Sequence, residues 1–320
     1  MNRRLVGGAA AVVILAVLAG LTYSLALSLT AMTPGALQAT IMAIVSFALV
    51  ATIFAALEHV SPEQSVRREW RQRERRADVC WWFVGYGSRF AADITTFVCI
   101  ALIIRVLPDH PTAMVNTQPL WLQMIEALLI GDFLQYWVHR CLHSRRLWSV
   151  HAIHHSPEDL NWLSATRIHP LEVILKGPIE MAPLYFLGFS SAATLPLVVI
   201  VLGLYELFLH ANVGWRFGAL RFVIASPAFH RWHHTAEVEG FDKDFAGLFP
   251  FYDLAFGTYF LPDRASSAYG LGRGQRMSSS FWRQLINPGH SAVDTIPTAR
   301  RRLSSVDNIA TLTRPTSAES

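Results

Sequence analysis

Apolar residues in this chain are gathered in long runs that short polar segments separate. The first run covers residues 5–29 and the second residues 36–57, and each is long enough to cross a bilayer. Two more runs cover residues 79–107 and 120–138. The pattern therefore predicts transmembrane helices. For the first run, a cleaved signal peptide is the alternative interpretation.

Two later apolar runs, residues 171–189 and 192–209, are interrupted by prolines. Pro178 and Pro183 lie in the first of them and Pro196 in the second. Such short, interrupted segments fit either a transmembrane hairpin or a re-entrant pair, and the sequence leaves both open. The predicted fold class is an all-α, multi-pass transmembrane helical bundle.

Arginines indicate which side of the membrane the polar segments face. Residues 67–76 contain six arginines, whereas residues 30–35, between the first two runs, contain no Lys or Arg. Basic loops remain on the cytoplasmic side. We therefore expect this segment, the N-terminus and the inner ends of the helices to be cytoplasmic. Glutamates interleaved with the arginines favour a solvated surface helix over a binding patch.

The same pattern divides the chain into four parts. We expect an N-terminal transmembrane hairpin over residues 1–58, a basic cytoplasmic loop over 59–78 and a main domain over 79–262. Residues 263–320 form a polar segment rich in Ser, Arg, Gly and Thr. That composition predicts a disordered tail.

Composition supports the bilayer as the solvent for much of the chain. Of its 320 residues, 52% are hydrophobic and 16% charged, and the mean hydropathy is +0.32. Soluble domains carry roughly 25% charged residues. The net charge of +4 comes from arginines spread over loops and tail without a recognisable nucleic-acid module, so no nucleic-acid partner is expected. Three cysteines without CxxC spacing exclude a disulfide framework and thiolate zinc ribbons.

Histidines are the main candidates for chemistry, because nine of the thirteen fall into four groups near the predicted span ends. These groups are His139 with His143, then His151 with His154 and His155, then His210, and finally His230 with His233 and His234. On a helix, positions i, i+3 and i+4 lie on neighbouring parts of one side. We therefore expect the two HxxHH triplets to bring six imidazoles to a common centre.

This density of imidazoles predicts a two-metal site. Each buried imidazole has two nitrogens that need partners, which is hard to satisfy without metal. Nine ligands exceed the three or four that one zinc ion uses. A zinc-protease HExxH motif is absent, since Arg140 and Ala152 occupy the positions after the first histidines. Imidazole alone does not choose among Zn, Cu, Fe and Ni.

Neighbouring residues are candidates for supporting these ligands. Asp132 lies seven residues before His139 on the same stripe and is expected to orient an imidazole through its free N–H. Glu206 lies one turn before His210 on the same face of the predicted helix. His169 precedes a proline, where helical backbone is disfavoured, and is expected to shape the pocket. The three remaining histidines, His59, His110 and His290, are interpreted as ordinary polar residues.

Residues 128–260 resemble the fatty acid hydroxylase superfamily, also called the sterol desaturase family. The motifs that carry the resemblance are Asp132-Phe-Leu-Gln-Tyr-Trp-Val-His139-Arg, Leu147-Trp148, Asn161, Arg167-Ile-His169-Pro170-Leu-Glu172, His210-Ala-Asn212, Pro227-Ala-Phe-His230-Arg-Trp-His233-His234 and Asp253-Leu-Ala-Phe-Gly257-Thr-Tyr. The resemblance implies that the nine histidines hold two iron ions. It implies that Glu206 is either a ligand or a support for one, and it adds Asn212 and Glu172 to Asp132 as supporting site residues.

The resemblance also implies an activity. Members use O2 as a co-substrate to hydroxylate or desaturate C–H bonds of a sterol, fatty acyl or related lipid, and some cleave ether lipids. Electrons come from a separate donor, a small b-type cytochrome or a ferredoxin with its reductase. The chain departs from the family pattern in residues 242–247. Many relatives carry Asn-Tyr/Phe-Gly there, whereas Asp244 and Ala246 replace the Asn and the first Gly. The role of this loop is thus open.

Two other classes of function compete with an oxygenase. A metal transporter places polar ligands near the bilayer midplane, whereas these histidines lie at or beyond the span ends. A haem-binding electron carrier needs axial residues on facing helices and has no use for HxxHH triplets. Both are therefore less favoured.

Overall fold

A computed structural model of the chain describes residues 36–294, except for residues 65–67, 107–114, 116, 190–193, 273–274, 279, 287 and 289–291. In chain order its main helices are α2 (Ala36–Val60), α3 (Arg68–Val106), α5 (Leu120–Leu142), α6 (Trp148–His151), α7 (Pro170–Phe186), α8 (Thr194–His210), α9 (Pro227–His233), α10 (Phe251–Phe256) and α11 (Phe281–Ile286). Short 3-10 helices are η1 (Trp162–Thr166), η2 (Gly218–Phe222) and η3 (Val238–Gly240), and strands are β1 (Gln275–Met277) and β2 (Ala292–Asp294). The prediction of a mostly helical fold is confirmed; the added element is the small antiparallel sheet of β1 and β2.

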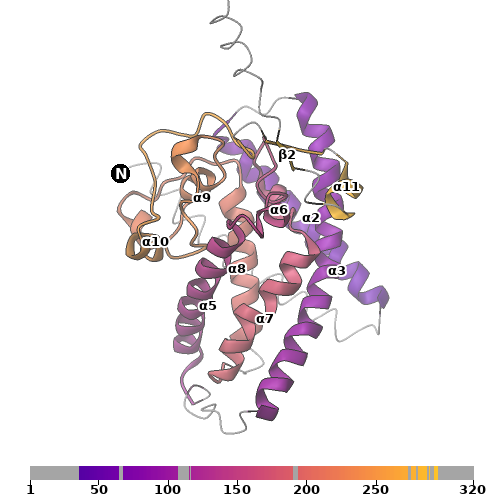
Figure 1. Cartoon of the computed structure of the whole chain (residues 1–320), viewed down its shortest axis with the longest axis vertical. Helices are drawn as coiled ribbons and strands as arrows, with labels where there is room; N and C mark the ends of the chain where they lie inside the picture. Colours follow the sequence, from indigo (N-terminus) through magenta and orange to yellow (C-terminus); the bar gives the residue numbers. More distant parts are fainter. Residues whose placement is uncertain are drawn as a thin grey trace, which may run out of the picture.

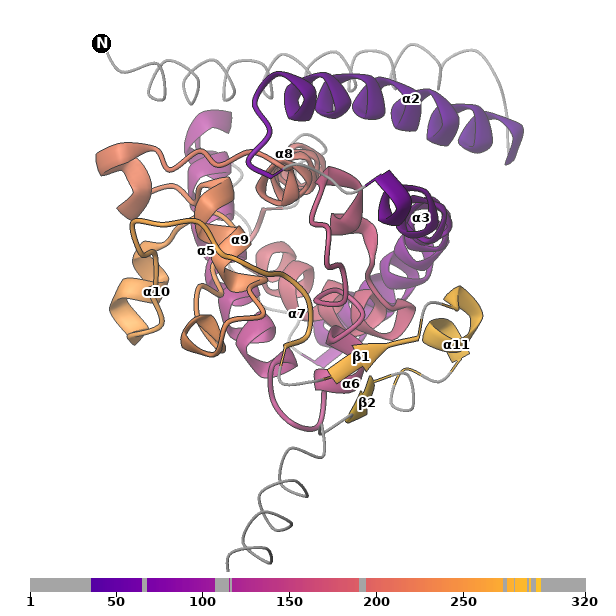
Figure 2. The same cartoon turned by 90° about the horizontal axis from the view of Figure 1, so that it is seen from above.

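Four long helices, α3, α5, α7 and α8, run along the long axis of the molecule (Figure 1). Helix α7 packs against α3 and α5, and α8 packs against α5. Helix α2 lies along one side of this bundle, beside α8 and α3 (Figure 2). The short helices α6, α9 and α10 gather at one end of the bundle (Figure 1). This end carries the histidines.

Helix α7 is continuous although its sequence suggested an interruption. Its start is fixed by Pro170, and by the Nδ1 atom of His169, which accepts the N–H of Leu171 at 3.1 Å. Pro178 and Pro183 lie inside the helix without ending it. Gly177 lets α7 approach α3 closely, because a Cβ there would lie 3.2 Å from the Cβ of Ala92. The prolines therefore do not divide this segment.

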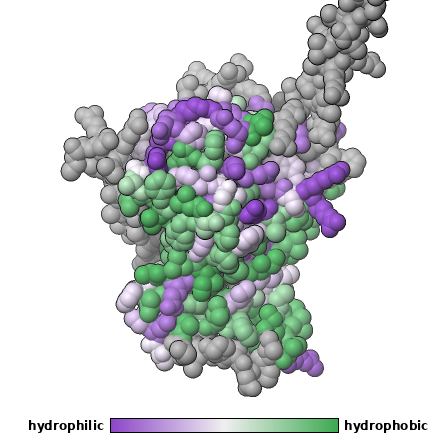
Figure 3. Space-filling view, turned by 60° about the vertical axis from the view of Figure 1, so that its left-hand side comes forward, coloured by the Kyte–Doolittle hydropathy of each residue, from purple (hydrophilic) through white to green (hydrophobic). Residues whose placement is uncertain are grey.

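The bundle is apolar on its outer surface as well as in its core. Phe54, Phe208 and Phe229 are almost fully buried where α2, α8 and α9 meet. By contrast, Phe90 and Phe97 of α3 are about 70% exposed. Figure 3 shows apolar residues covering much of one face. Within the part of the chain that the structure describes, no helix combines the length and the apolar character needed to span a membrane. The first predicted span, residues 5–29, lies outside that part.

The C-terminal segment is ordered further than its composition suggested. Gln284 of α11 accepts the indole N–H of Trp81 at 3.0 Å, and the ring of Phe281 packs edge-on against the same indole. The carbonyl of Leu285 accepts the Nε2–H of His169 at 2.9 Å. The prediction of a disordered tail from residue 263 is therefore wrong for this part, because a few side chains dock α11 onto α3 and α7. Residues 295–320 lie outside the described part.

The structure has no boundary between elements where the basic loop was predicted to meet the third apolar segment. Helix α3 begins at Arg68 and runs to Val106, so it joins half of the expected loop to the apolar run. The arginine-rich sequence is helical, as expected.

Candidate metal centre

All nine predicted histidines lie at the end of the bundle that α6 and α9 cover. His139 lies in the last turn of α5, and His143 caps that helix. His151 is the last residue of α6, His154 and His155 lie in the turn that follows, and His210 is the last residue of α8. His230 and His233 lie in α9, and His234 caps α9. Eight of them are buried, and His143 is partly buried. Helix ends therefore bring together histidines that are up to 95 positions apart in the chain.

These side chains form two groups, each with possible ligand nitrogens within 4.8 Å of one another. The five-histidine group contains His139, His143, His151, His155 and His233. The four-histidine group contains His154, His210, His230 and His234. The structure thus offers two ligand sets, in agreement with the expectation of two ions.

The two HxxHH triplets are divided between the groups, which corrects the expectation that each points to one centre. His151 and His155 join the five-histidine group, and His154 joins the other. In the second triplet, His233 joins the five-histidine group, whereas His230 and His234 join the other. Consecutive residues on a helix point about 100° apart, so the i+3 and i+4 histidines separate while i and i+4 remain together. Each triplet therefore contributes to both groups.

Hydrogen bonds fix which nitrogen of several imidazoles faces the five-histidine centre. The Nδ1–H of His139 donates to the carbonyl of Phe245 at 2.8 Å, and that of His233 donates to the carbonyl of Lys243 at 2.7 Å. The Nδ1–H of His151 donates to Glu172 at 3.1 Å. A neutral imidazole has one N–H, so Nε2 of each of these rings presents a lone pair.

The lone pairs converge at distances that fit a cation. Nε2 of His151 lies 3.1 Å from Nε2 of His139 and 3.2 Å from Nε2 of His155. Two nitrogens bound at right angles to one ion, each at about 2.1 Å, would be about 3.0 Å apart. Since the Nε2 atoms of His139 and His151 carry no proton, their close approach is repulsive unless a positive ion lies between them. The residues therefore fit a metal ion.

The four-histidine group converges in the same way. Nε2 of His210 lies 3.2 Å from Nε2 of His154 and 3.2 Å from Nε2 of His230, and Nε2 of His234 lies 3.1 Å from that of His230. The Nδ1–H of His210 donates to the carbonyl of Glu206 at 2.8 Å. This group, too, presents nitrogens to one centre.

Burial keeps the imidazoles neutral, as metal binding requires. It lowers the pKa of His234 well below its ordinary value, and the neighbouring imidazoles lower it further. Burial lowers the pKa of His155 and His233 in the same way. The Nε2 atoms of His143 and His233 are buried and have no hydrogen-bond partner among the described residues. Both are thus available as ligands.

The loop whose role was open, residues 242–247, orients histidines of the five-histidine group. Besides the carbonyls of Lys243 and Phe245, the carboxylate of Asp242 lies 3.3 Å from Nδ1 of His143. The conformation of this loop requires left-handed backbone at Asp242 and Asp244, whose φ angles are 56° and 58°. Asp tolerates that region better than most residues. Three of the five imidazoles therefore depend on one short segment.

Buried carboxylates hold this loop in place. Asp132 accepts the backbone N–H groups of Gly247, Leu248 and Phe249 at 2.7–3.0 Å. The expectation that Asp132 orients an imidazole directly is thus wrong, because these backbone groups occupy its oxygens. Asp253 plays a similar part.

Asp253 accepts the N–H groups of Phe245 and Ala246 and the hydroxyl of Thr258. Asp244 is fully buried and accepts the N–H of Phe260 at 2.7 Å, while its other oxygen has no partner among the described residues. Burial raises the pKa of Asp244 well above its usual range, and nearby Asp253 raises it further. The loop thus carries one carboxylate that is poorly solvated.

The other predicted supporting residues divide between the site and its surroundings. Glu172 contacts His151, which is the kind of contact expected for Asp132. Glu206 lies outside both histidine groups, and it is its backbone carbonyl that contacts His210. The side chain of Asn212 forms hydrogen bonds with Gln64 and with no histidine in the described part of the chain.

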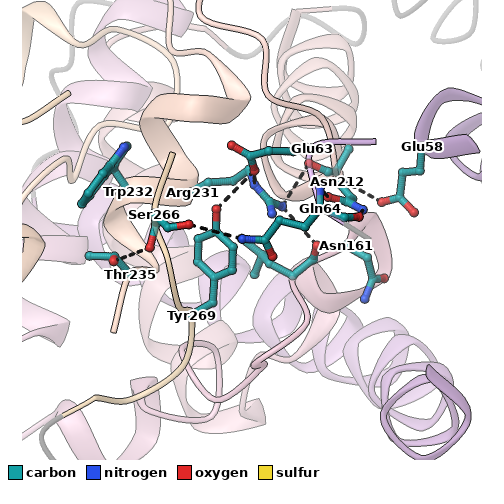
Figure 4. Close-up of polar contacts among 12 residues, drawn as sticks. Glu58, Glu63, Gln64, Asn161, Asn212, Arg231, Trp232, Thr235, Ser266 and Tyr269 are labelled. Carbon is teal, nitrogen blue, oxygen red and sulfur yellow. Dashed lines mark hydrogen bonds and ion pairs between the residues drawn. The ribbon is translucent and has the colours of Figure 1, made fainter. Parts of the chain in front are cut away.

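Asn212 instead belongs to a polar network between α2 and the histidine-bearing end of the bundle (Figure 4). Its side chain bonds the backbone of Gln64, and its N–H donates to Glu58 at 2.9 Å. Arg231 is buried and lies between His230 and His233 in the sequence. It forms an ion pair with Glu63 and donates to the carbonyl of Leu160 at 3.1 Å. His169 caps α7, as described above. These contacts position the helices.

A cavity below the histidines contains charged residues that sequence reasoning missed. It is lined by His139, His151, His154 and His230 at one end and extends between α3, α5, α7 and α8. Lys176 and Glu180 of α7 line it together with Glu172. Three charged residues spaced four apart in an otherwise apolar helix are the sequence signal that could have predicted this lining. A second cavity reaches His143, His155 and His233 from the loop side.

Comparisons with known proteins agree with this geometry. The sequence profile of the fatty acid hydroxylase family matches residues 124–258, which contain every one of the nine histidines. An ornithine lipid hydroxylase of Rhizobium tropici is 28% identical over 246 residues, which are 74% of this chain and 72% of that protein. No solved structure matches the chain significantly.

Two further relatives are similar over shorter stretches. The alkylglycerol monooxygenase of Homo sapiens is 33% identical over 146 residues, 45% of this chain. A very-long-chain aldehyde decarbonylase of Oryza sativa is 30% identical over 138 residues, 40% of this chain. The matched part spans only 32% and 21% of these two proteins. Each of these matches thus covers less than half of this chain.

Proposed function

Since the chain belongs to the fatty acid hydroxylase superfamily, we propose that it is a membrane-bound oxidoreductase that holds two iron ions and uses O2 to hydroxylate or desaturate a lipid C–H bond. The observation that carries this proposal is the division of nine histidines, eight of them buried, into two converging groups. The named relatives include a lipid hydroxylase, a monooxygenase and an aldehyde decarbonylase. Oxidation of a lipid is the chemistry that the first two share.

The contacts indicate which chemistry the metal ions would supply and which positioning the protein would supply. The five-histidine group would hold one iron ion and the four-histidine group the other. Bound iron would supply O2 activation and the removal of hydrogen from carbon. The chain's own residues hold the ligands: Glu172 and the carbonyls of residues 243 and 245 fix the imidazoles, and burial excludes water.

Access for a lipid is supported by the cavity that ends at His139, His151, His154 and His230. The bundle around it exposes large apolar side chains, including Trp121, Phe97 and Ile179. Large exposed apolar surface is typical of a membrane-facing region. Together with the arginine asymmetry of the sequence, this favours a membrane protein with the histidines on the cytoplasmic side.

Electrons would reach the site from a separate donor protein, a small b-type cytochrome or a ferredoxin with its reductase. The second cavity supports an approach from the loop side, because His143, His155 and His233 line it together with Trp148. The ring centroid of Trp148 lies 5.2 Å from those of His143 and His155. A donor that docks there would approach the five-histidine group first.

Cleavage of an ether lipid is a second candidate reaction. The similarity to alkylglycerol monooxygenases favours it, although the chain matches about a third of the length of those proteins. Hydroxylation next to an ether oxygen differs from ordinary hydroxylation only in the fate of the product, so the two candidates share the same histidines. A histidine-rich transporter is the remaining, less favoured alternative.

The test is metal analysis of protein purified without oxygen, followed by lipid analysis of cells with and without the gene. We expect about two irons per chain and a lipid product that contains an added oxygen atom or a new double bond. His154→Ala should abolish the product and leave membrane insertion intact, and His59→Ala, outside both groups, should change neither. One tightly bound zinc ion with no change in lipids would contradict the proposal.

A further inference from the structure

The four-histidine group is built from three separate segments of the chain. His154 lies in the turn after α6, and His210 is the last residue of α8. Helix α9 contains His230 and is capped by His234. In the part of the chain that the structure describes, the buried Nδ1 atoms of His154, His230 and His234 have no hydrogen-bond partner. The positions of these imidazoles therefore depend on how the three segments are held against one another.

Arg231 of α9 connects these three segments through one side chain. It is only 1% exposed. Its Nη1 atom donates to the carbonyl of Leu160 at 3.1 Å and to that of Ala211 at 3.4 Å. Leu160 lies six residues after His154, and Ala211 is the first residue after α8. Because the guanidinium is planar and its N–H groups point in fixed directions, these contacts restrict how far the segments can move apart.

Glu58 of α2 connects two of the same segments by the opposite kind of hydrogen bond. Its Oε1 atom accepts the backbone N–H of Trp162 at 2.8 Å and that of Asn212 at 2.9 Å. These two residues lie two positions and one position after the carbonyls that Arg231 binds. Neighbouring backbone carbonyls and N–H groups of the two segments are thus bound by one cation and one carboxylate.

Glu63, just after α2, holds Arg231 in place (Figure 4). The two side chains form a buried ion pair, and the backbone N–H of Glu63 donates to the carbonyl of Asn212 at 3.1 Å. The hydroxyl of Tyr269 donates to the Glu63 carboxylate at 3.2 Å, and the guanidinium lies over the Tyr269 ring, 4.5 Å from its centroid. A buried guanidinium that lost its carboxylate would be strongly destabilised, so this pairing keeps Arg231 between the segments.

We propose that Arg231, Glu58 and Glu63 position the four-histidine group for metal binding, so that the end of α2 belongs to the metal centre. The inference rests on the proposed function, because it assigns a metal ion to that group. Metal ligands have to be held within about 0.5 Å of their productive positions. Glu58 and Glu63 precede residues 124–258, which match the family profile, so the histidine-bearing segment relies on residues outside that match.

The five-histidine group gives the proposal its selectivity. Four of its imidazoles are held at Nδ1 by Glu172 or by residues 242, 243 and 245. His233, which shares α9 with Arg231, is one of them, since its Nδ1–H donates to the carbonyl of Lys243. Loosening the contacts of Arg231 should therefore weaken the four-histidine group and leave the five-histidine group largely intact.

The test is an anaerobic titration of the metal-free, full-length protein in nanodiscs with Fe(II) against a competing chelator. We expect the wild type to bind two ions. Arg231→Gln and Glu58→Ala should each bind one ion with the wild-type affinity and the other at least about tenfold more weakly, the range found when outer support of a ligand is lost. Glu58→Gln keeps an oxygen that can accept both N–H groups, so it should restore the weaker affinity to within about threefold of the wild type.

Arg264→Gln is the matched control. Its guanidinium lies over the ring of Trp232 in α9 and pairs with Glu237, and its printed contacts in the described part of the chain include neither Leu160 nor Ala211. Both ions should therefore bind as in the wild type. Equal weakening in Arg264→Gln and in Arg231→Gln would assign the effect to general loosening of α9 and overturn the proposal.

Mössbauer spectra of the protein loaded with 57Fe identify which ion is affected. The component that weakens in Arg231→Gln should be the one that is missing from His234→Ala. The variant that combines both substitutions should bind no less iron than His234→Ala alone, because both changes act on the same group. Weakening of the other component would contradict the proposal.

The remaining outcomes separate this inference from the proposed function. Two ions bound with unchanged affinity in Arg231→Gln and Glu58→Ala, or equal weakening of both ions, would overturn the positioning role and leave the proposed function standing. If Arg231→Gln does not fold, Glu58→Ala and its rescue by Glu58→Gln decide the question. Selective weakening in a protein that forms no oxidised lipid would support the positioning role and contradict the proposed function. A wild type without metal at the four-histidine group would contradict both.

Discussion

The two histidine groups use the same ligand type but are supported in different ways. In the five-histidine group, four imidazoles have a partner at Nδ1: Glu172 for His151 and residues 242, 243 and 245 for the others. In the four-histidine group, only the Nδ1 of His210 has one among the described residues, while those of His154, His230 and His234 are buried without partners. One group is therefore oriented by a loop and a carboxylate, and the other mainly by the helices that carry it.

This difference has a thermodynamic consequence. A hydrogen bond at the second nitrogen fixes ring orientation and raises ligand basicity, so its loss weakens metal binding. A site with five ligands also retains four when one is removed, whereas a site with four retains three. We therefore expect the five-histidine group to bind its ion more tightly and to tolerate substitution better.

The largest expected effect comes from two adjacent residues that belong to different groups. His234→Ala removes one of four ligands and should reduce the iron content from about two to about one per chain. His233→Ala leaves four ligands in its group and should retain more iron than His234→Ala, although with lower activity. Iron stoichiometry after dialysis against a chelator measures both. Equal loss of iron in the two variants would contradict the asymmetry.

Glu172→Gln tests the carboxylate that anchors the five-histidine group. Replacing the carboxyl group by an amide weakens the acceptor for the Nδ1–H of His151 and should weaken iron binding at that group by about tenfold or more, the range found for outer partners of ligating histidines. Competition titration with a chelator gives the affinity. Glu180→Gln on the same helix is the matched control and should leave iron binding unchanged, because Glu180 contacts Lys176 and no histidine.

Asp242→Asn should have a smaller effect, although Asp242 also contacts an imidazole. Its side chain is 65% exposed, whereas that of Glu172 is 4% exposed. Exposed ion pairs contribute about 0–1 kcal/mol, so iron affinity should fall by less than about fivefold. A loss as large as that of Glu172→Gln would show that solvent exposure does not distinguish the two anchors.

The smallest expected effect is on stability, at Asp244. Its folded pKa is raised, so the folded state binds a proton more readily than the unfolded state, and stability is lost as pH rises above the usual range of the carboxyl group. Asp244→Asn removes this loss and still offers an oxygen to the N–H of Phe260 and tolerates a positive φ.

The melting temperature of this variant should exceed that of the wild type by about 2–4 °C at about pH 8, and by less at about pH 5. Asp253→Asn is the control and should be destabilising, because Asp253 accepts two backbone N–H groups and a hydroxyl. If the gain in melting temperature of Asp244→Asn over the wild type became smaller as pH rises, the raised pKa of Asp244 would be contradicted.

The sequence by itself identified the nine histidines that the structure brings together, and it predicted the helical character of the fold. Histidines four apart must lie on one side of a helix, and helices that end at the same level bring them together, so His139, His143 and the two triplets were found by spacing alone. The apolar runs likewise predicted α5 and α7 with boundaries close to the observed ones. Local periodicity carries this information because it depends only on neighbouring residues.

Only the tertiary structure decided how the nine histidines divide into five and four, which backbone carbonyls orient them, and that Asp132 holds a loop rather than a ligand. It also revealed the charged lining of the cavity and the docking of α11 onto α3. These features depend on contacts between segments far apart in the chain, such as His139 with Phe245 or Trp81 with Gln284. Spacing along one helix fixes directions around its axis, but which helix or loop lies in that direction is set by packing of the whole chain.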